Sequence, residues 1–192
     1  TFHEKSVDLN SIVTQFGGPG ENKLKNMLYL HGLFGSGANW RGIASAVQPR
    51  TLVNTHLLDA RNHGLSPHTQ EMSYDLMAED LFRYIVKNDL GRCILLGHSM
   101  GGRSVMTFAS KYPELVEKLI VVDVAPVSYG SEHYDYHLGL MRNLKKLNLD
   151  EIRTRKQAEA EASKFIDVRA HQGLTFSIFC CFSYPLCGPF SS

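Results

Sequence analysis

The sequence lacks both an excess of charge of either sign and a long uninterrupted hydrophobic run. Its 192 residues include 20 Lys and Arg against 19 Asp and Glu, so the formal net charge is +1. A protein that binds nucleic acid or an anionic surface usually carries a clear basic surplus, so no nucleic-acid partner is predicted. The apolar stretch that begins at Leu174 is interrupted by Ser and Pro. It falls short of the ~20 apolar residues that span a bilayer, so no firm membrane association is expected.

Cysteine is scarce, and its placement indicates neither a zinc site nor a disulfide framework. Cys93 lies within an apolar run, whereas the other three cysteines crowd the end of the chain at positions 180, 181 and 187. Because no histidines stand at ligand spacing from them, no metal site is predicted, and the pattern favours a reducing compartment. The chain begins with Thr1 and not with Met, so we expect any targeting segment to lie outside this sequence.

Short apolar runs alternate with helical patterns along the first two thirds of the chain. Strands are predicted at 27–30, 51–58, 93–96 and 119–122, with a weaker edge strand at 7–13. Helical spacing occurs at 38–47, ending before Pro49, and from the N-cap residue Ser73 to Val86. Continuous apolar strands are typical of a parallel sheet that is buried on both faces. The order therefore predicts an α/β fold, with helices covering both faces of a mostly parallel sheet.

The pattern changes after Asp123. A helix is predicted around residues 138–147, and Thr154 and Gln157 are spaced as the capping box of a second helix that runs to about Ile166. Two helices without an intervening strand are typical of a lid inserted into an α/β core. The predicted organisation is a core at 1–127, the start of a helical lid at 128–170 and an atypical tail at 171–192.

The pentapeptide Gly97-His98-Ser99-Met100-Gly101 follows the apolar run 93–96 and precedes a helical pattern. A strand that turns sharply into a helix, with a serine at the turn, is the nucleophile elbow of acyl-transferring hydrolases. The tight turn exposes the hydroxyl, and the glycines on either side leave room for it. The free amide groups at the start of the helix point toward the reacting oxygen. A glycine-rich turn with an incidental serine is the alternative interpretation.

Four ordered motifs resemble the α/β-hydrolase fold: HGLFGS at 31–36, DARNHGLSP at 59–67, GHSMGG at 97–102 and VDVAPV at 122–127. They are most similar to the small-esterase branch, which contains alpha/beta hydrolase domain-containing protein 11 and short bacterial esterases. The resemblance covers roughly residues 24–169 and is lost from about His171. It implies a serine hydrolase of small-molecule acyl esters or thioesters that needs no cofactor. It also implies a mitochondrial location, with the cytoplasm as the alternative.

The chemistry of that reaction assigns roles to individual residues. Ser99 is the predicted nucleophile, and the backbone N–H groups of Met100 and Leu33 are the predicted oxyanion-hole donors. Asp123 ends the strand that follows Ser99 and is the predicted orienting acid, although it could instead cap the turn before Ala125. His31 is predicted to fix its loop through a hydrogen bond.

The residue that remains without a candidate is the catalytic base. In this fold the order is Ser, acid, then a late His, and the histidines that follow Asp123 are His133, His137 and His171. The first two lie in the predicted lid, and the third directly precedes the unfamiliar tail. Two functions therefore stay open: a carboxylic ester hydrolase, or a catalytically impaired, C-terminally truncated product that lacks the base and acts as a non-catalytic or unstable chain.

Overall fold

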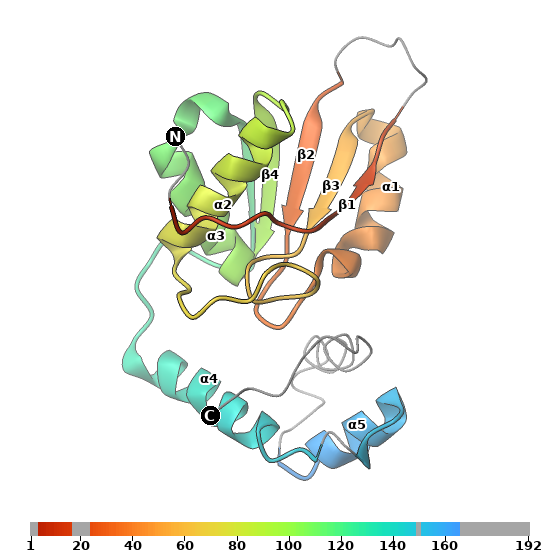
Figure 1. Ribbon diagram of the computed structural model, residues 1–192, viewed down its shortest axis with the longest axis vertical. Helices are drawn as coiled ribbons and strands as arrows, with labels where there is room; N and C mark the ends of the chain where they lie inside the picture. The colour runs from red at the N-terminus through yellow and green to blue at the C-terminus, as the bar shows by residue number, and fades with distance from the viewer. Residues whose placement is uncertain (1–3, 17–23, 149–150, 166–192) are drawn as a thin grey trace. The chain divides into compact units, whose positions relative to one another are not determined.

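The computed structural model describes residues 4–16, 24–148 and 151–165. The chain divides into two compact units, residues 1–126 and 127–192, which are considered separately. The first unit is built on a five-stranded sheet with the order β1-β3-β2-β4-β5 (Figure 1). Its strands are β1 (Ser11–Thr14), β2 (Asn26–Leu30), β3 (Asn54–Leu58), β4 (Cys93–His98) and β5 (Val116–Val122). Only β1 runs antiparallel to its neighbour, so the predicted α/β fold with a mostly parallel sheet is confirmed.

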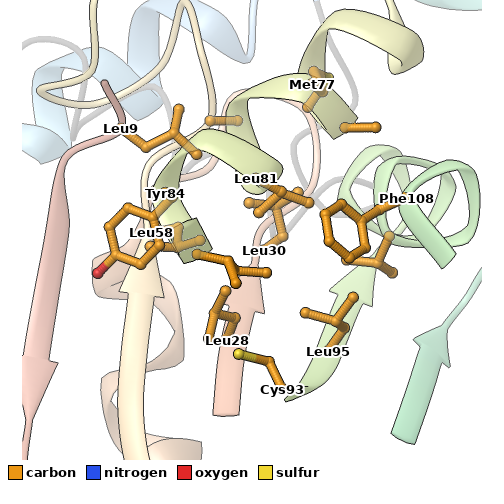
Figure 2. Close-up of a cluster of buried hydrophobic side chains, with 14 of the residues drawn as sticks. Leu9, Leu28, Leu30, Leu58, Met77, Leu81, Tyr84, Cys93, Leu95 and Phe108 are labelled. Carbon is orange, nitrogen blue, oxygen red and sulfur yellow. The ribbon is translucent and has the colours of Figure 1, made fainter. Parts of the chain in front are cut away.

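Helices cover both faces of this sheet (Figure 1). Helix α1 (Arg41–Thr51) and the preceding short helix η1 (Gly37–Trp40) lie on one face, and α2 (Tyr74–Lys87) and α3 (Met100–Lys111) lie on the other. A single-turn helix, η2 (Pro113–Leu115), leads into β5. The alternation of side chains along β2 divides the core in two. Leu28 and Leu30 pack toward α2 and α3 (Figure 2), whereas Met27 and Tyr29 pack toward α1.

Helix α1 is longer than its sequence pattern predicts. We expected it to end before Pro49, but it continues to Thr51, and β3 accordingly begins at Asn54 and not at residue 51. Pro49 has no backbone N–H to donate, but two other donors form hydrogen bonds in the last turn of the helix. The hydroxyl of Thr51 donates to the carbonyl of Val47 at 3.0 Å. Leu52, in the left-handed region at φ 54°, donates its N–H to the carbonyl of Gln48 at 2.9 Å and ends the helix.

The second unit contains α4 (Ser131–Leu144) and α5 (Arg155–Ala162). The predicted capping box at the start of α5 is confirmed, because Thr154 and Gln157 each accept a hydrogen bond from the backbone N–H of the other. The helix ends at Ala162 and not at about Ile166 as predicted, because the N–H groups of Lys164 and Phe165 donate to carbonyls three residues back and form a turn. The predicted tail at 171–192 lies outside the described residues. The lid role of this unit stays a prediction. Within the described ranges, no helix combines the length and the hydropathy needed to cross a membrane.

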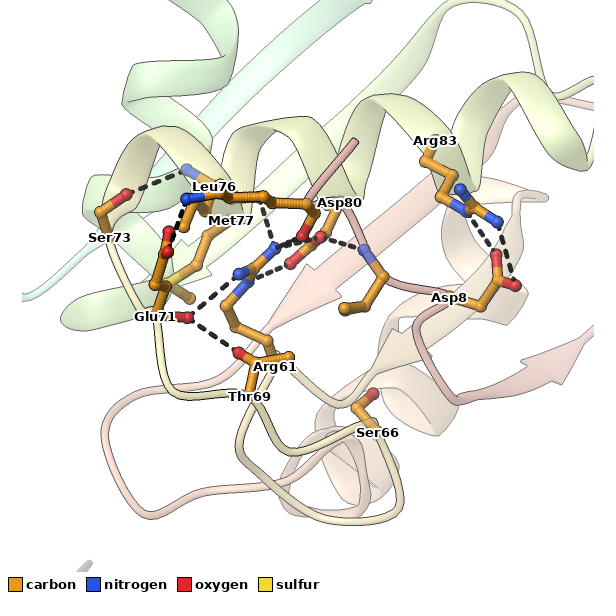
Figure 3. A network of polar contacts seen from close by, with 12 residues as sticks. Asp8, Arg61, Ser66, Thr69, Glu71, Ser73, Leu76, Met77, Asp80 and Arg83 are labelled. Carbon is orange, nitrogen blue, oxygen red and sulfur yellow. Dashed lines mark hydrogen bonds and ion pairs between the residues drawn. The ribbon is translucent and has the colours of Figure 1, made fainter. Parts of the chain in front are cut away.

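A buried ion pair joins three parts of the first unit (Figure 3). The guanidinium of Arg61, in the loop after β3, donates to both carboxylate oxygens of Asp80 on α2 at 2.6 Å, and both side chains are 1% exposed. Asp80 also accepts the backbone N–H of Val7 at 2.7 Å. Arg61 donates further to the carbonyls of Glu71 and Leu76. The pair therefore anchors both the N-terminal segment and the loop after β3 to α2.

Truncating one partner of this pair should be costly, because it leaves the other charge buried. We expect Asp80→Ala to lower the free energy of unfolding by about 3–5 kcal/mol, measured by urea denaturation. The double variant Arg61→Met with Asp80→Leu should recover most of that loss, since no charge then stays buried. Asp8→Ala, which breaks the exposed pair with Arg83 shown in Figure 3, is the matched control and should change stability little. A small effect of Asp80→Ala would contradict the anchoring role.

Candidate active site

Ser99 occupies the sharp turn between β4 and α3. Its backbone has φ 51° and ψ −113°, a conformation that non-glycine residues seldom adopt. Such a residue carries strain of order 1–3 kcal/mol and persists where its surroundings hold it. Here the N–H of Ser99 donates to the carbonyl of Val122 at the end of β5, at 3.0 Å. The predicted order of strand, turn and helix is present, with a half-buried serine at the turn.

Two glycines allow the segments around this turn to come close together. A Cβ on Gly101, in the first turn of α3, would lie 2.5 Å from the carbonyl oxygens of Leu30 and His31. A Cβ on Gly32, in the loop after β2, would lie 2.8 Å from Nδ1 of His98 and 3.4 Å from the Cβ of Ser99. The helix start therefore packs directly on the end of β2, and the loop after β2 lies against Ser99.

The two predicted oxyanion-hole donors flank Ser99 in this arrangement. Met100 follows Ser99 as the first residue of α3, and Leu33 follows Gly32 in the loop after β2. The backbone N–H groups of Leu33 and Met100 have no hydrogen-bond acceptor among residues 4–16, 24–148 and 151–165. Both groups are thus available as donors beside the serine.

His31 fixes the peptide unit that carries the Leu33 N–H. Its Nδ1 lies 2.7 Å from the carbonyl oxygen of Gly32, and its Nε2 accepts the backbone N–H of Ala60 at 3.0 Å. A carbonyl only accepts, so the ring is neutral, with its proton on Nδ1. Because a trans peptide is planar, holding the Gly32 carbonyl toward the ring turns the Leu33 N–H to the opposite side. Burial, together with the smaller effect of neighbouring His63, lowers the pKa of His31 from 6.5 to about 4.

Asp123 directly follows β5, next to the same turn. It also adopts a left-handed backbone conformation, with φ 56°, and its carboxylate is 85% exposed. One carboxylate oxygen lies 3.6 Å from Nε2 of His98, the residue before Ser99. Sequence reasoning missed this contact, although His98 stands within the pentapeptide. A register argument could have found it, because His98 and Val122 are paired across β4 and β5.

None of the three histidines that follow Asp123 belongs to the first unit, which contains Ser99. His137 lies on α4 in the second unit, which is described by itself. His133 lies on the same helix, and nothing is described of its side chain, whereas His171 falls outside the described residues. Among the described residues, no three His, Cys, Asp or Glu side chains are grouped so that they could hold a metal ion. The groups assembled beside Ser99 are therefore a carboxylate, an imidazole and two open backbone donors.

Three comparisons with known proteins converge. A family model described as the alpha/beta hydrolase fold matches residues 25–156. The sn-1-specific diacylglycerol lipase ABHD11 of Danio rerio is 39% identical over 165 residues, which cover 84% of this chain and 51% of that protein. Esterase YbfF of Escherichia coli (strain K12) is 36% identical over 137 residues, which cover 70% of this chain and 51% of that protein.

A solved structure is similar as well. A marine microorganism esterase superposes with a TM-score of 0.79 at 36% identity, covering 91% of this chain and 63% of that chain. This chain spans about half the length of the curated relatives that it matches.

The buried neutral histidines should make stability depend on pH. Burial lowers the pKa of His31 and of His56 from 6.5 to about 4, and it also lowers the pKa of His63. The unfolded chain then binds protons below pH 6.5 that the folded chain does not, so stability falls as pH drops from 6.5 toward 4. Urea denaturation at intervals over this range should show the decline. His68→Gln, at an exposed position, should retain most of the decline, because burial is the main cause of the lowered pKa values. A flat profile in the unaltered protein would contradict the pH dependence.

Proposed function

The chain belongs to the α/β-hydrolase fold family, and from that membership we propose that it hydrolyses carboxylic esters or thioesters with Ser99 as the nucleophile. The observation that carries the proposal is the conformation of Ser99 at the junction of β4 and α3. A serine held at φ 51° in a strand-to-helix turn matches the nucleophile elbow, which lifts the hydroxyl clear of its own backbone. The family's esterase and lipase members support the same reaction class.

In the proposed reaction, the Ser99 oxygen attacks the acyl carbon and a base accepts the hydroxyl proton. The carbonyl oxygen becomes an oxyanion, for which the N–H groups of Leu33 and Met100 are the proposed donors. The alkoxide or thiolate leaves with that proton, and the acyl group stays on Ser99 as an ester. Water then releases the acid in the same way. Each step needs the two amides to point at one oxygen, which the packing of Gly32 and Gly101 supports.

Asp123 is the proposed orienting carboxylate. Its support is its position at the end of β5, where the Ser99 N–H bonds to the neighbouring residue Val122. Its contact with His98 supports the view that this carboxylate can hold an imidazole beside the nucleophile. The base itself usually comes late in the chain order of this fold.

The proposed substrates are small-molecule acyl esters and thioesters. The zebrafish relative is named a diacylglycerol lipase and the Escherichia coli relative an esterase. Glycerol esters and simple alcohol esters therefore both belong in a substrate panel. A graded series of acyl lengths tests whether the site accepts lipid-like chains.

Ser99→Ala is expected to abolish turnover of a short-chain p-nitrophenyl ester, because the nucleophile is lost. Loss of one member of a catalytic triad typically lowers kcat by about 10⁴-fold or more. The measurement is release of p-nitrophenolate, together with intact-mass analysis after treatment with an organophosphate that modifies activated serines. The unaltered protein should gain one adduct, located on Ser99 by peptide mapping. Ser110→Ala, at the end of α3 and away from the turn, is the matched control.

The two readouts separate the candidate functions. Turnover that depends on Ser99 supports the hydrolase. One adduct on Ser99 without multiple turnover would instead support a catalytically impaired chain, in which Ser99 is activated but water does not release the acyl group from it. No adduct and no turnover would contradict the proposed role of Ser99.

Asp123→Asn is expected to lower kcat by about 10⁴-fold while leaving KM nearly unchanged. The amide keeps the shape of the side chain but cannot stabilise a charged imidazolium. Steady-state kinetics on the same ester provide the test. Asp89→Asn is a matched control, because Asp89 also has a positive φ, of 49°, but lies just beyond the end of α2. Equal kcat values for Asp123→Asn and Asp89→Asn would contradict a role for Asp123 in orienting the base.

A further inference from the structure

Three hydrogen bonds, each from a backbone N–H to a side chain, join the loop after β3 to the segment after β2. The N–H of Phe34 donates to Nε2 of His63 at 3.1 Å, and the N–H of Gly37 donates to a carboxylate oxygen of Asp59 at 2.7 Å. In the reverse direction, the N–H of Ala60 donates to Nε2 of His31 at 3.0 Å. All three acceptors are side chains that are no more than 7% exposed. The two loops are thus joined by hydrogen bonds to buried side chains.

His63 uses both ring nitrogens in this arrangement. Its Nδ1 lies 2.9 Å from the carbonyl oxygen of Arg61, which can only accept, so Nδ1 carries the proton. Nε2 is therefore the free acceptor that receives the Phe34 N–H. A second proton would place an N–H of the ring against an N–H of the loop and break this bond. The site therefore requires His63 to be neutral, in the Nδ1–H tautomer.

The bond from Phe34 stabilises an unfavourable turn. Residues 32–35 form a turn that is closed by the N–H of Gly35 and the carbonyl of Gly32 at 3.0 Å. Phe34 stands at its third position with φ 61°, where turns of this kind favour glycine. Rotation of the peptide between Leu33 and Phe34 would convert the turn to a type without positive φ. The hydrogen bond to His63 opposes that rotation, because it holds the N–H of the same peptide.

We propose that His63 is a positioning residue for ester hydrolysis: through the Phe34 N–H it fixes the turn that presents the Leu33 N–H to the oxyanion. This inference rests on the proposed function and deepens it. His63 does not touch the substrate in this account. It acts on the peptide next to the donor, while His31 holds the peptide that contains the donor.

The electrostatic surroundings agree with a neutral His63. Burial lowers the pKa of His63, and exposed His68 lowers it further, whereas Asp59 and the carbonyl of Arg61 oppose the change. The ring of His31 lies with its centroid 5.1 Å from that of His63, so a charge on one ring disfavours a charge on the other.

The kinetic test compares His63→Leu with His63→Gln. Leucine removes the acceptor, and we expect kcat to fall by about 10- to 100-fold with little change in KM. This is less than the 10²–10³-fold loss for a missing oxyanion donor. Glutamine offers an amide oxygen near the position of Nε2 and should restore most of the lost kcat. His68→Leu, a matched change at an exposed position of the same loop, should keep the kcat of the unaltered protein.

A second measurement does not depend on the folding of variants. Nitrogen-15 NMR of the full chain should show the Nδ1–H tautomer for His63, and slow hydrogen exchange should protect the Phe34 amide. The Nε2–H tautomer or an unprotected Phe34 amide would overturn the inference. Turnover in His63→Leu that equals that of the unaltered protein would overturn it while leaving the proposed function intact. Failure of Ser99 to react at all would overturn both.

Discussion

The close approach of helix α3 to the end of strand β2 is the constraint on which the rest of the site depends. Gly101 brings the first turn of α3 against the carbonyls of Leu30 and His31, at a distance that no side chain allows. Ser99 can then occupy a strained turn, because β2 and β5 hold it from two sides. The hydrogen bond from Ser99 to Val122 extends the pairing of β4 with β5 and so helps to hold this strained residue in place.

The loop after β3 is the second support of the site, and it contributes mainly polar groups. Arg61 anchors this loop to α2 through Asp80, while His63 and Asp59 accept backbone donors from the loop after β2. These groups are almost fully buried, so each must be paired. The result is a polar layer at the end of the sheet that keeps the main chain near Ser99 in one conformation. Neutral imidazoles suit this layer because they donate and accept at once.

The sequence predicted some local features correctly, but it did not reveal a contact between residues that are distant in the chain. The Ser73 cap and the capping box at Thr154 were predicted correctly, because each depends on residues three positions apart. The end of α1 was predicted wrongly, because Pro49 indicated a stop that Thr51 and Leu52 compensated for within the last turn. The contact between His98 and Asp123 was missed, because it joins two strands and depends on their register.

By itself, the sequence determined the alternation of strands and helices and the glycine-flanked serine between an apolar run and a helical pattern. These features follow from side-chain periodicity and backbone freedom, which neighbouring residues set. Only the tertiary structure decided which side chains hold the loop after β2, and in which tautomer. The hydrogen bond of His31 within its own loop was predicted from the sequence. The role of His63 appears only when β2 and β3 pair in parallel register and bring their loops to the same edge. Hydrogen bonds between distant segments have no sequence period, so the fold must form before they can be identified.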